Sequence, residues 1–355
     1  MLTLCLCSTD SGAGKTAHAV ALGRRFQRDH LSVEYLLTVT SPGAGPGERS
    51  VPAFIRRALN LGEPRDRIFP VSLHAALETF SGEITYTERL RTVAADVGAG
   101  RDVLILETGD SIVDGSLIGL GVPDVVRVLN APTLIVARYT GEGVVDAILA
   151  ARWAIGAPVI GAVITGIPVP QMEYATRTLR PALERRGVRV LGAYPSDRML
   201  AAVTVRELVT ELGGTFLSGE DAAEELVERL MVGAMTADHA ASYFRRQANK
   251  AVITGGDRPS IQLAALETPT RCLILTGQFS PDPAVLARAQ ELGIPVVTVP
   301  LDTLSAVERS QEVFSQSRFQ QEKKIARFVE LVNRHFDVAA LYSALGLRPR
   351  PNSGS

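Results

Sequence analysis

The residues with the most distinctive chemistry lie near the start of the chain, where residues 8–16 read STDSGAGKT. An apolar run at residues 2–7 precedes this segment, and a pattern with helical periodicity follows it from Lys15. Backbone N–H groups at a helix start attract anions, a lysine there bridges phosphates, and a neighbouring hydroxyl holds Mg²⁺. The order of strand, glycine-containing loop and helix therefore predicts a phosphate-binding loop, against the alternative of a tight turn that binds nothing.

Seven consecutive residues of this loop are predicted to surround a nucleotide, and ATP with Mg²⁺ is the expected ligand. They are Asp10, Ser11, Gly12, Ala13, Gly14, Lys15 and Thr16. Lys15 is expected to reach the β- and γ-phosphates, and the Thr16 hydroxyl is expected to hold the metal. The strict pattern of such loops has a glycine where this chain has Thr9, so the loop is predicted to be a relaxed variant.

Three acidic residues are candidates for contact with the metal. Glu107 ends the apolar run VLILE, where its carboxylate either holds Mg²⁺, directly or through water, or faces solvent as an ordinary strand-end acid. Asp10 either contacts metal or a partner subunit, or caps the turn of the loop. Asp110 is a weaker candidate than these two. We therefore predict Thr16 and Glu107 as the metal ligands.

The elements expected around the loop alternate regularly. Apolar runs expected as strands occupy residues 2–7, 32–39, 102–108, 132–139, 159–166 and 188–195. Helical patterns occupy residues 15–29, 52–60, 85–98, 144–155, 172–186 and 200–211. Continuous apolar strands separated by helices indicate a parallel sheet that is covered on both faces. Residues 1–215 are therefore predicted to form a doubly wound α/β domain around the phosphate loop.

A smaller α/β domain is predicted over residues 220–336. Helical patterns are expected at residues 221–231, 236–247, 259–267, 282–291 and 302–314, with strands in KAVITGGDR, TRCLILTG and IPVVTVP. A last helix carries an apolar stripe of Ile325, Phe328, Leu331 and Val332. Residues 345–355 are expected to form a flexible tail.

The turn Gly255, Gly256, Asp257 and Arg258 is the candidate ligand site of the smaller domain. Consecutive glycines with free N–H groups can form an anion-binding nest, to which Arg258 adds a charged donor. The same residues can equally form a tight turn before a helix capped by Asp257, with Pro259 in its first turn, and such a turn requires no ligand.

Composition narrows the classes of function. The 355 residues carry 37 basic and 38 acidic side chains, a net charge of −1 that gives no bulk attraction to nucleic acid or anionic membranes. Three cysteines are too few for a disulfide framework, and Cys5 and Cys7 are expected to face the same packed side of a strand. No apolar stretch has the length of a membrane span, and the five histidines have no metal-ligand spacing. We expect a cytoplasmic protein whose histidines lie on the surface or on helices.

Several segments resemble known families. STDSGAGKT is similar to G-T-D-x-x-x-G-K-T, the relaxed loop of dethiobiotin synthetases and related P-loop enzymes, with Ser8 in the place of the glycine. Residues 103–156 and 194–214 resemble the dethiobiotin-synthetase-like N-terminal domain of long phosphotransacetylases. Residues 249–277 resemble the DRTGG domain that follows it in those enzymes. The resemblance covers about residues 1–335 and implies the regulatory half of such an enzyme without its catalytic domain.

Three positions depart from what the resemblance implies. Leu37 stands where active dethiobiotin synthetases have a substrate lysine. Val51 stands at about the position of an acid that helps those relatives hold Mg²⁺, and Glu48 is the nearest acid here. Thr165 stands where relatives read the base with an asparagine. A hydroxyl offers one weaker contact in place of the donor and acceptor pair of an amide. These changes predict a site that binds phosphates but turns over poorly.

Two functions remain as hypotheses. The first is a nucleotide-binding regulatory protein whose DRTGG domain couples ligand state to self-association or to an enzyme of acetyl-phosphate metabolism. The alternative is a slow Mg²⁺-dependent ATPase, or an ATP-dependent carboxylate ligase like dethiobiotin or cobyrinic acid synthases. Because relatives of the P-loop half often dimerise near the nucleotide, the resemblance also implies a homodimer.

Overall fold

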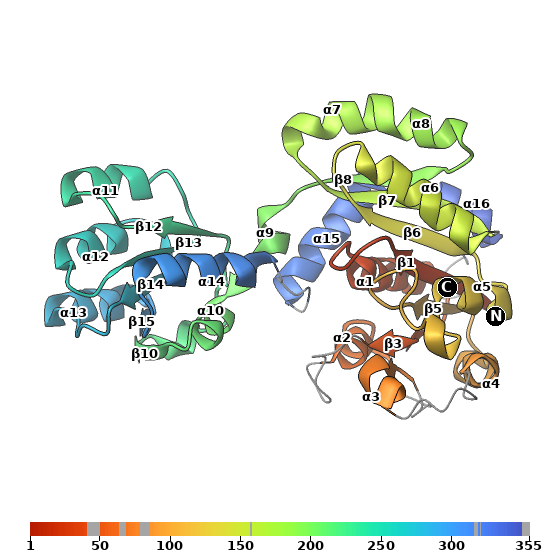
Figure 1. Cartoon of the computed structure of the whole chain (residues 1–355), viewed down its shortest axis with the longest axis horizontal. Coiled ribbons are helices and arrows are strands. Elements are labelled where there is room, and N and C mark those ends of the chain that lie inside the picture. The colour runs from red at the N-terminus through yellow and green to blue at the C-terminus, as the bar shows by residue number, and fades with distance from the viewer. Residues whose placement is uncertain are drawn as a thin grey trace, which may run out of the picture. The chain divides into compact units, whose positions relative to one another are not determined.

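The computed structural model describes residues 1–40, 50–63, 69–78, 86–156, 158–315, 319 and 321–349. The chain divides into two compact units (Figure 1). The first contains Met1–Ser196 together with Phe319–Ser355, and the second contains Asp197–Arg318. The second unit thus begins before the predicted boundary at residues 215–220, and the end of the chain returns to the first unit.

The first unit is built on a six-stranded parallel sheet with the order β2-β5-β1-β6-β7-β8. The strands are β1 (Leu2–Ser8), β2 (Val33–Leu37), β5 (Val103–Glu107), β6 (Thr133–Arg138), β7 (Val159–Ile167) and β8 (Val190–Pro195). A two-stranded ladder joins β3 (Val39–Thr40) to β4 (Val71–Ser72). The predicted doubly wound parallel sheet is confirmed, and its first strand lies inside the sheet with neighbours on both sides.

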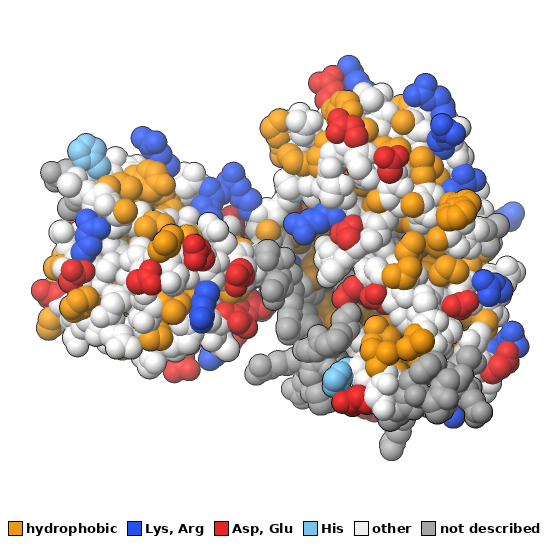
Figure 2. Space-filling model, viewed as in Figure 1, with side chains coloured by type: hydrophobic (Ala, Val, Ile, Leu, Met, Phe, Trp, Pro, Cys, Tyr) orange, Lys and Arg blue, Asp and Glu red, His pale blue; other side chains and the backbone are white. Residues whose placement is uncertain are grey.

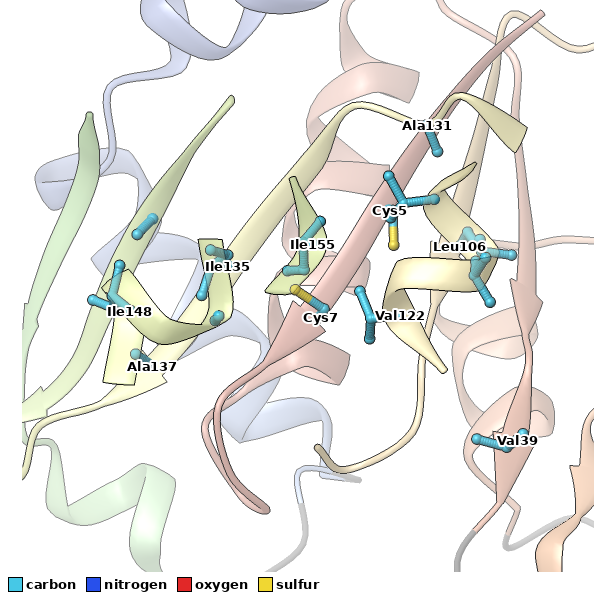
Figure 3. Packing of buried hydrophobic residues seen from close by; sticks show 14 of the residues in the cluster. Cys5, Cys7, Val39, Leu106, Val122, Ala131, Ile135, Ala137, Ile148 and Ile155 are labelled. Carbon is cyan, nitrogen blue, oxygen red and sulfur yellow. The ribbon is translucent and has the colours of Figure 1, made fainter. Parts of the chain in front are cut away.

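Helices cover both faces of this sheet (Figure 1). They are α1 (Lys15–Arg28), α2 (Val51–Ala58), α3 (Leu73–Glu78), α4 (Thr87–Gly98), α5 (Val122–Leu129), α6 (Gly143–Ile155), α7 (Met172–Tyr174), α8 (Arg180–Arg185), α15 (Glu322–His335) and α16 (Val338–Leu345). Cys5 and Cys7 point into one core cluster with Leu106, Val122 and Ile135, as expected for residues two apart on a strand (Figure 3). Both thiols are buried and free.

The C-terminal segment, from Phe319 onward, belongs to the first unit. Helix α15 packs against α1 and β8. The predicted apolar stripe of α15 is buried, with Ile325, Phe328, Leu331 and Val332 each at most 4% exposed. Helix α16 extends to Leu345, so the predicted tail begins at the last residue of a helix. Residues 350–355 of that tail lie outside the described residues.

The second unit contains a five-stranded sheet with the order β10-β15-β14-β13-β12, in which only β10 is antiparallel. Its elements are α9 (Arg198–Ala201), β9 (Val203–Thr204), α10 (Val205–Glu211), β10 (Thr215–Ser218), β11 (Leu226–Val227), β12 (Arg229–Val232), α11 (Ala237–Phe244), β13 (Lys250–Gly255), α12 (Pro259–Leu266), β14 (Thr270–Thr276), α13 (Pro283–Leu292), β15 (Val296–Thr298) and α14 (Thr303–Ser315). Val203, Val205 and Leu208 share a core with Ala251 and Ile253, which is why the unit begins earlier than predicted.

The helix predicted at residues 221–231 is wrong. A short 3-10 turn at Glu220–Ala222 is followed by strands β11 and β12. Strand β12 pairs with β13 in parallel, and this edge pairing overrides the helix-favouring composition of the segment.

Two other predicted helices are interrupted. The helix predicted at residues 200–211 is divided by β9, and Thr204 caps α10 in a capping box with Glu207. The helix predicted at residues 172–186 contains a π-helical stretch at Ala175–Leu179, just before Pro181, which has no N–H to donate.

The surface in view mixes charges of both signs. Figure 2 shows acidic and basic side chains interspersed over the face in view, in line with the nearly balanced composition. Within the described part of the chain, no helix combines the length and apolar character required to cross a bilayer.

Lys250 provides a pH-dependent test of the second unit. It is fully buried, its Nζ donates to the Pro269 carbonyl oxygen at 3.1 Å, and burial lowers its pKa from 10.5 to about 8. Between these two values the unfolded chain binds more protons than the folded chain, so the unfolding free energy rises with pH. Relative to Lys250→Met, we expect the wild type to gain on the order of 2 kcal/mol from pH 8 to 10.5 in urea titrations. Parallel curves for the two proteins would contradict this.

Candidate functional site

The loop between β1 and α1 exposes backbone donors to an anion. Gly12 and Gly14 have φ of 71° and 104°, a region that favours glycine. Gly14 is the N-cap of α1 and supplies no side-chain acceptor, and the first turn of the helix contains no acidic residue. The first N–H groups of α1 therefore have no side-chain acceptor from the cap, and the positive end of the helix dipole adds to their attraction for an anion.

Lys15 is held inside this loop. Its side chain is only 6% exposed, and Nζ donates to Ser8 Oγ at 2.7 Å. Nζ also lies 3.8 Å from Asp110 Oδ1. Ser8 Oγ in turn donates to the Asp110 carbonyl oxygen at 2.8 Å. The serine that replaces the glycine of the resembled pattern thus provides the acceptor that positions the lysine.

Glu107 and Thr16 are direct partners. The Thr16 hydroxyl donates to Glu107 Oε1 at 2.7 Å, and the Tyr35 hydroxyl donates to Oε2 at 3.0 Å. Burial raises the pKa of the Glu107 carboxyl, and the charge of Lys15 and the two hydroxyl donors oppose that rise. The structure thus places both predicted metal ligands side by side, as hard oxygen donors suited to Mg²⁺. Among the described residues, no three His, Cys, Asp or Glu side chains gather to hold a metal.

Of the remaining loop residues, some are held by hydrogen bonds and others are exposed to solvent. Ala13 is buried, and its carbonyl oxygen accepts a hydrogen bond of 2.8 Å from the Thr165 hydroxyl on β7. Thr165 therefore braces the loop, and its contact with a base stays a prediction. Asp10 accepts from the Thr9 hydroxyl at 2.6 Å, whereas Ser11 and Gly12 are exposed.

The other two positions that depart from the resembled pattern, Leu37 and Val51, lie beside Glu107 and at a helix start. Leu37 is 6% exposed and pairs with Glu107 in the sheet register, so an apolar side chain occupies the expected lysine position. Val51 is the first residue of α2, and Glu48 lies outside the described residues. Thr38 directly follows β2 and is fully buried. Its Oγ1 has no hydrogen-bond partner among the described residues.

Sequence reasoning missed three aromatic or imidazole partners of the site. Tyr35 binds Glu107, His18 contacts the Gly14 carbonyl, and Tyr194 contacts His18. His18 lies on a helix as expected, but it is fully buried. Its spacing of four residues from Gly14 was the only sequence signal, because residues four apart on a helix are neighbours.

The candidate ligand site of the second unit, residues 255–258, forms a turn whose polar groups bond to neighbouring parts of the same unit. Neither Gly255 nor Gly256 has a positive φ, and a Cβ on Gly256 would lie 2.9 Å from both Cβ and the carbonyl oxygen of Phe279. The N-cap of α12 is Arg258 and makes no side-chain cap, so the expected cap at Asp257 is wrong.

The side chains around this turn are also engaged. Arg258 donates to the carbonyl oxygens of Gly233 and Met235 at 2.6 and 2.7 Å. The buried Gln262 Nε2 donates to the Gly255 and Gly256 carbonyl oxygens, and its Oε1 has no partner among the described residues. The geometry is that of a tight, internally bonded turn, and a ligand at these four residues stays a prediction.

Comparison with protein families gives two matches that together span most of the chain. The AAA domain family AAA_26 matches residues 2–204, and the DRTGG domain matches residues 207–313.

Two curated relatives are both phosphate acetyltransferases. The protein from Synechocystis sp. is 29% identical over 177 residues, which cover 46% of this chain and 25% of that protein. The protein from Nitratidesulfovibrio vulgaris is 21% identical over 363 residues, which cover 96% of this chain and 51% of that protein. The chain thus spans at most about half the length of these relatives.

Solved structures give more distant similarities. The regulatory CBS and DRTGG domains of Clostridium perfringens pyrophosphatase, in complex with the activator diadenosine tetraphosphate, are 22% identical with a TM-score of 0.30, over 34% of this chain and 50% of that one. Chloroplast FtsY from Physcomitrella patens is 13% identical with a TM-score of 0.38, over 55% of this chain and 59% of that one.

The hydrogen bond from Thr165 to Ala13 is open to a direct test. Thr165→Val keeps the shape but removes the donor, and we expect it to lower the unfolding free energy by about 1 kcal/mol. For a unit of this size that is a fall in Tm of about 2–4 °C. Thr165→Ser keeps the hydroxyl and is the control. Equal Tm values for the valine and serine variants would refute the brace.

Proposed function

We propose a function that starts from the family of this chain, which belongs to the AAA domain family AAA_26. The protein is a regulatory protein that binds a nucleotide, with ATP as the first candidate, and hydrolyses it little or not at all. One observation carries the proposal. Lys15 and Thr16 lie at the uncapped start of α1, directly beside the buried carboxylate of Glu107. This arrangement gathers backbone donors, an ammonium group and oxygen ligands at one strand end, which is the chemistry that a nucleoside triphosphate with Mg²⁺ requires.

The donor set fits a magnesium nucleotide. Thr16 and Glu107 would hold the metal, which when bound supplies charge neutralisation to the phosphates. Lys15 would exchange its hydrogen bond with Ser8 for one with a phosphate oxygen. The N–H groups that begin α1 would orient the same phosphates, and the buried surroundings of Glu107 would keep bulk water from its carboxylate.

Low turnover follows from what the site lacks. Phosphoryl transfer depends on groups that position a nucleophile and stabilise the charge that develops. Leu37 brings an apolar side chain to the edge where related enzymes hold their substrate, and Val51 brings no acid. Among the described residues, the site thus keeps its phosphate donors, and Leu37 and Val51 supply neither the lysine nor the acid that the resemblance implies.

The regulatory part of the proposal rests on domain content. A DRTGG domain match follows the AAA domain match, and both curated relatives are phosphate acetyltransferases of which this chain spans at most about half. We propose a cytoplasmic homodimer that responds to nucleotide and acts on an enzyme of acetyl-phosphate metabolism. The turn at residues 255–258 is retained as a candidate contact for a second ligand.

A second candidate function is a slow Mg²⁺-dependent ATPase, or a ligase that activates a carboxylate with ATP. The intact set of Lys15, Thr16 and Glu107 favours it, since the same residues serve hydrolysis in related loops. Release of phosphate from ATP by the wild type, abolished in Lys15→Ala, would establish this alternative.

Thermal unfolding with ATP, ADP or GTP, each with and without Mg²⁺, tests nucleotide binding. A ligand at a hundred times its Kd adds about 2.7 kcal/mol to the unit that binds it. We expect a rise in Tm of about 5–10 °C with at least one nucleotide. Lys15→Ala should lose this rise, whereas the control Lys323→Ala, at an exposed lysine on α15, should keep it. If no nucleotide shifts the wild type, or if both variants lose the shift, the loop is not the site.

A further inference from the structure

His18 links the phosphate loop to two distant parts of the first unit. Its ring Nδ1 lies 2.8 Å from the Gly14 carbonyl oxygen, and Nε2 lies 3.3 Å from the Tyr194 hydroxyl. A carbonyl oxygen only accepts, so Nδ1 carries the proton and Nε2 accepts from the tyrosine. Burial lowers the pKa of His18 from 6.5 to about 4, which agrees with a neutral ring.

Aromatic side chains fix the position of this ring. Phe328 of α15 meets it edge-on, with ring centroids 4.9 Å apart, and Tyr194 of β8 meets it at 5.3 Å. Phe336 lies at 6.5 Å. His18 and Tyr194 are at most 1% exposed and Phe328 is 4% exposed, so the ring has little room to move without repacking its neighbours.

The contact with Gly14 acts on the group that would meet a phosphate. The Gly14 carbonyl and the Lys15 N–H belong to one planar trans peptide, so fixing the direction of the carbonyl oxygen fixes the direction of the N–H. Gly14 has a φ of 104° and no side chain, so its own packing does little to hold this peptide. The Gly14 carbonyl oxygen accepts from the backbone N–H of His18 at 3.1 Å, and the ring Nδ1–H is a second donor to the same oxygen. The orientation of the first donor of α1 is therefore set by the helix hydrogen bond together with the His18 ring.

The partners of His18 lie on the two segments of the first unit that precede and follow the second unit in the sequence. Tyr194 is on β8, the last strand before the first unit ends at Ser196, and Phe328 is on α15, the first helix after the chain returns at Phe319. The two segments that lead to and from the second unit thus meet at one ring inside the first unit.

We propose that His18 is a positioning residue of the phosphate loop, and that Tyr194 and Phe328 set its position from the two connecting segments. This inference rests on the proposed nucleotide binding and deepens it, since it names the contacts through which helix α15 would affect the site. A histidine that only fills the core would affect stability alone, whereas a positioning residue affects nucleotide affinity beyond its effect on stability.

Titration calorimetry of the full-length protein with ATP and Mg²⁺ separates these roles. His18→Leu removes both polar contacts of the ring but keeps the backbone hydrogen bond to Gly14, and His18→Asn keeps a side-chain donor near the position of Nδ1. Phe26→Leu is the matched control, because Phe26 is fully buried on the same helix but packs against Tyr342, far along α1 from Gly14. Thermal unfolding of each variant without ligand gives its loss of stability.

We expect His18→Leu to weaken ATP binding about 5–10-fold, the range for one lost hydrogen bond, and His18→Asn to restore part of that affinity. Phe26→Leu should bind as the wild type does despite a similar fall in Tm. Tyr194→Phe and Phe328→Leu should each weaken binding in the wild type but have little further effect in His18→Leu, since all act through one ring.

The outcomes distinguish this inference from the function on which it rests. A wild type that binds no nucleotide overturns the proposed function, and the positioning role falls with it. A wild type that binds ATP no more tightly than His18→Leu overturns the positioning role alone. Equal losses in His18→Leu and Phe26→Leu also overturn it, because they would reduce the effect to stability.

Discussion

The geometry of one peptide, between Gly14 and Lys15, depends on the register of the whole parallel sheet. The loop that contains this peptide has no core of its own, and it is held by contacts from β7, from the segment after β5 and from His18 on α1. Thr165 on β7 donates to the Ala13 carbonyl oxygen. Ser8 donates to the carbonyl oxygen of Asp110, in the segment after β5. These contacts exist because Leu6 aligns with Glu107, and Arg138 aligns with Thr165, in neighbouring ladders. A slip of one residue would turn each side chain to the other face.

The sequence predicted the local part of this arrangement well. The first strand, the loop and the start of α1 are consecutive, so their positions follow from glycine positions and apolar periodicity. The contacts that complete the site join residues far apart, with Tyr35 and Glu107 separated by 72 positions, Ala13 and Thr165 by 152, and His18 and Tyr194 by 176. No local pattern encodes such pairs, because they arise only when the strand order is fixed.

The same limit explains the errors in the fold. Residues 221–231 have a composition that favours a helix, but an open edge of β13 offers backbone partners that a solvent-exposed helix does not, and β12 forms there instead. The apolar stripe of α15 was predicted correctly as a stripe, yet periodicity does not say which sheet it covers. Its return to α1 and β8 is a property of topology, and it places Phe328 against His18.

These features connect the proposed function to its energetics. Binding energy accelerates a reaction only when it is greater in the transition state than in the ground state. In the proposed function, a loop with phosphate donors and with Leu37 beside Glu107 would bind the nucleotide about equally in the ground state and the transition state. Such energy is available instead to shift an equilibrium between conformations, up to the difference in affinity between them. In the proposed positioning role, the aromatic contacts of His18 are where such a difference would arise, since a shift of Phe328 that moved the ring would also change the hydrogen bond to the Gly14 carbonyl.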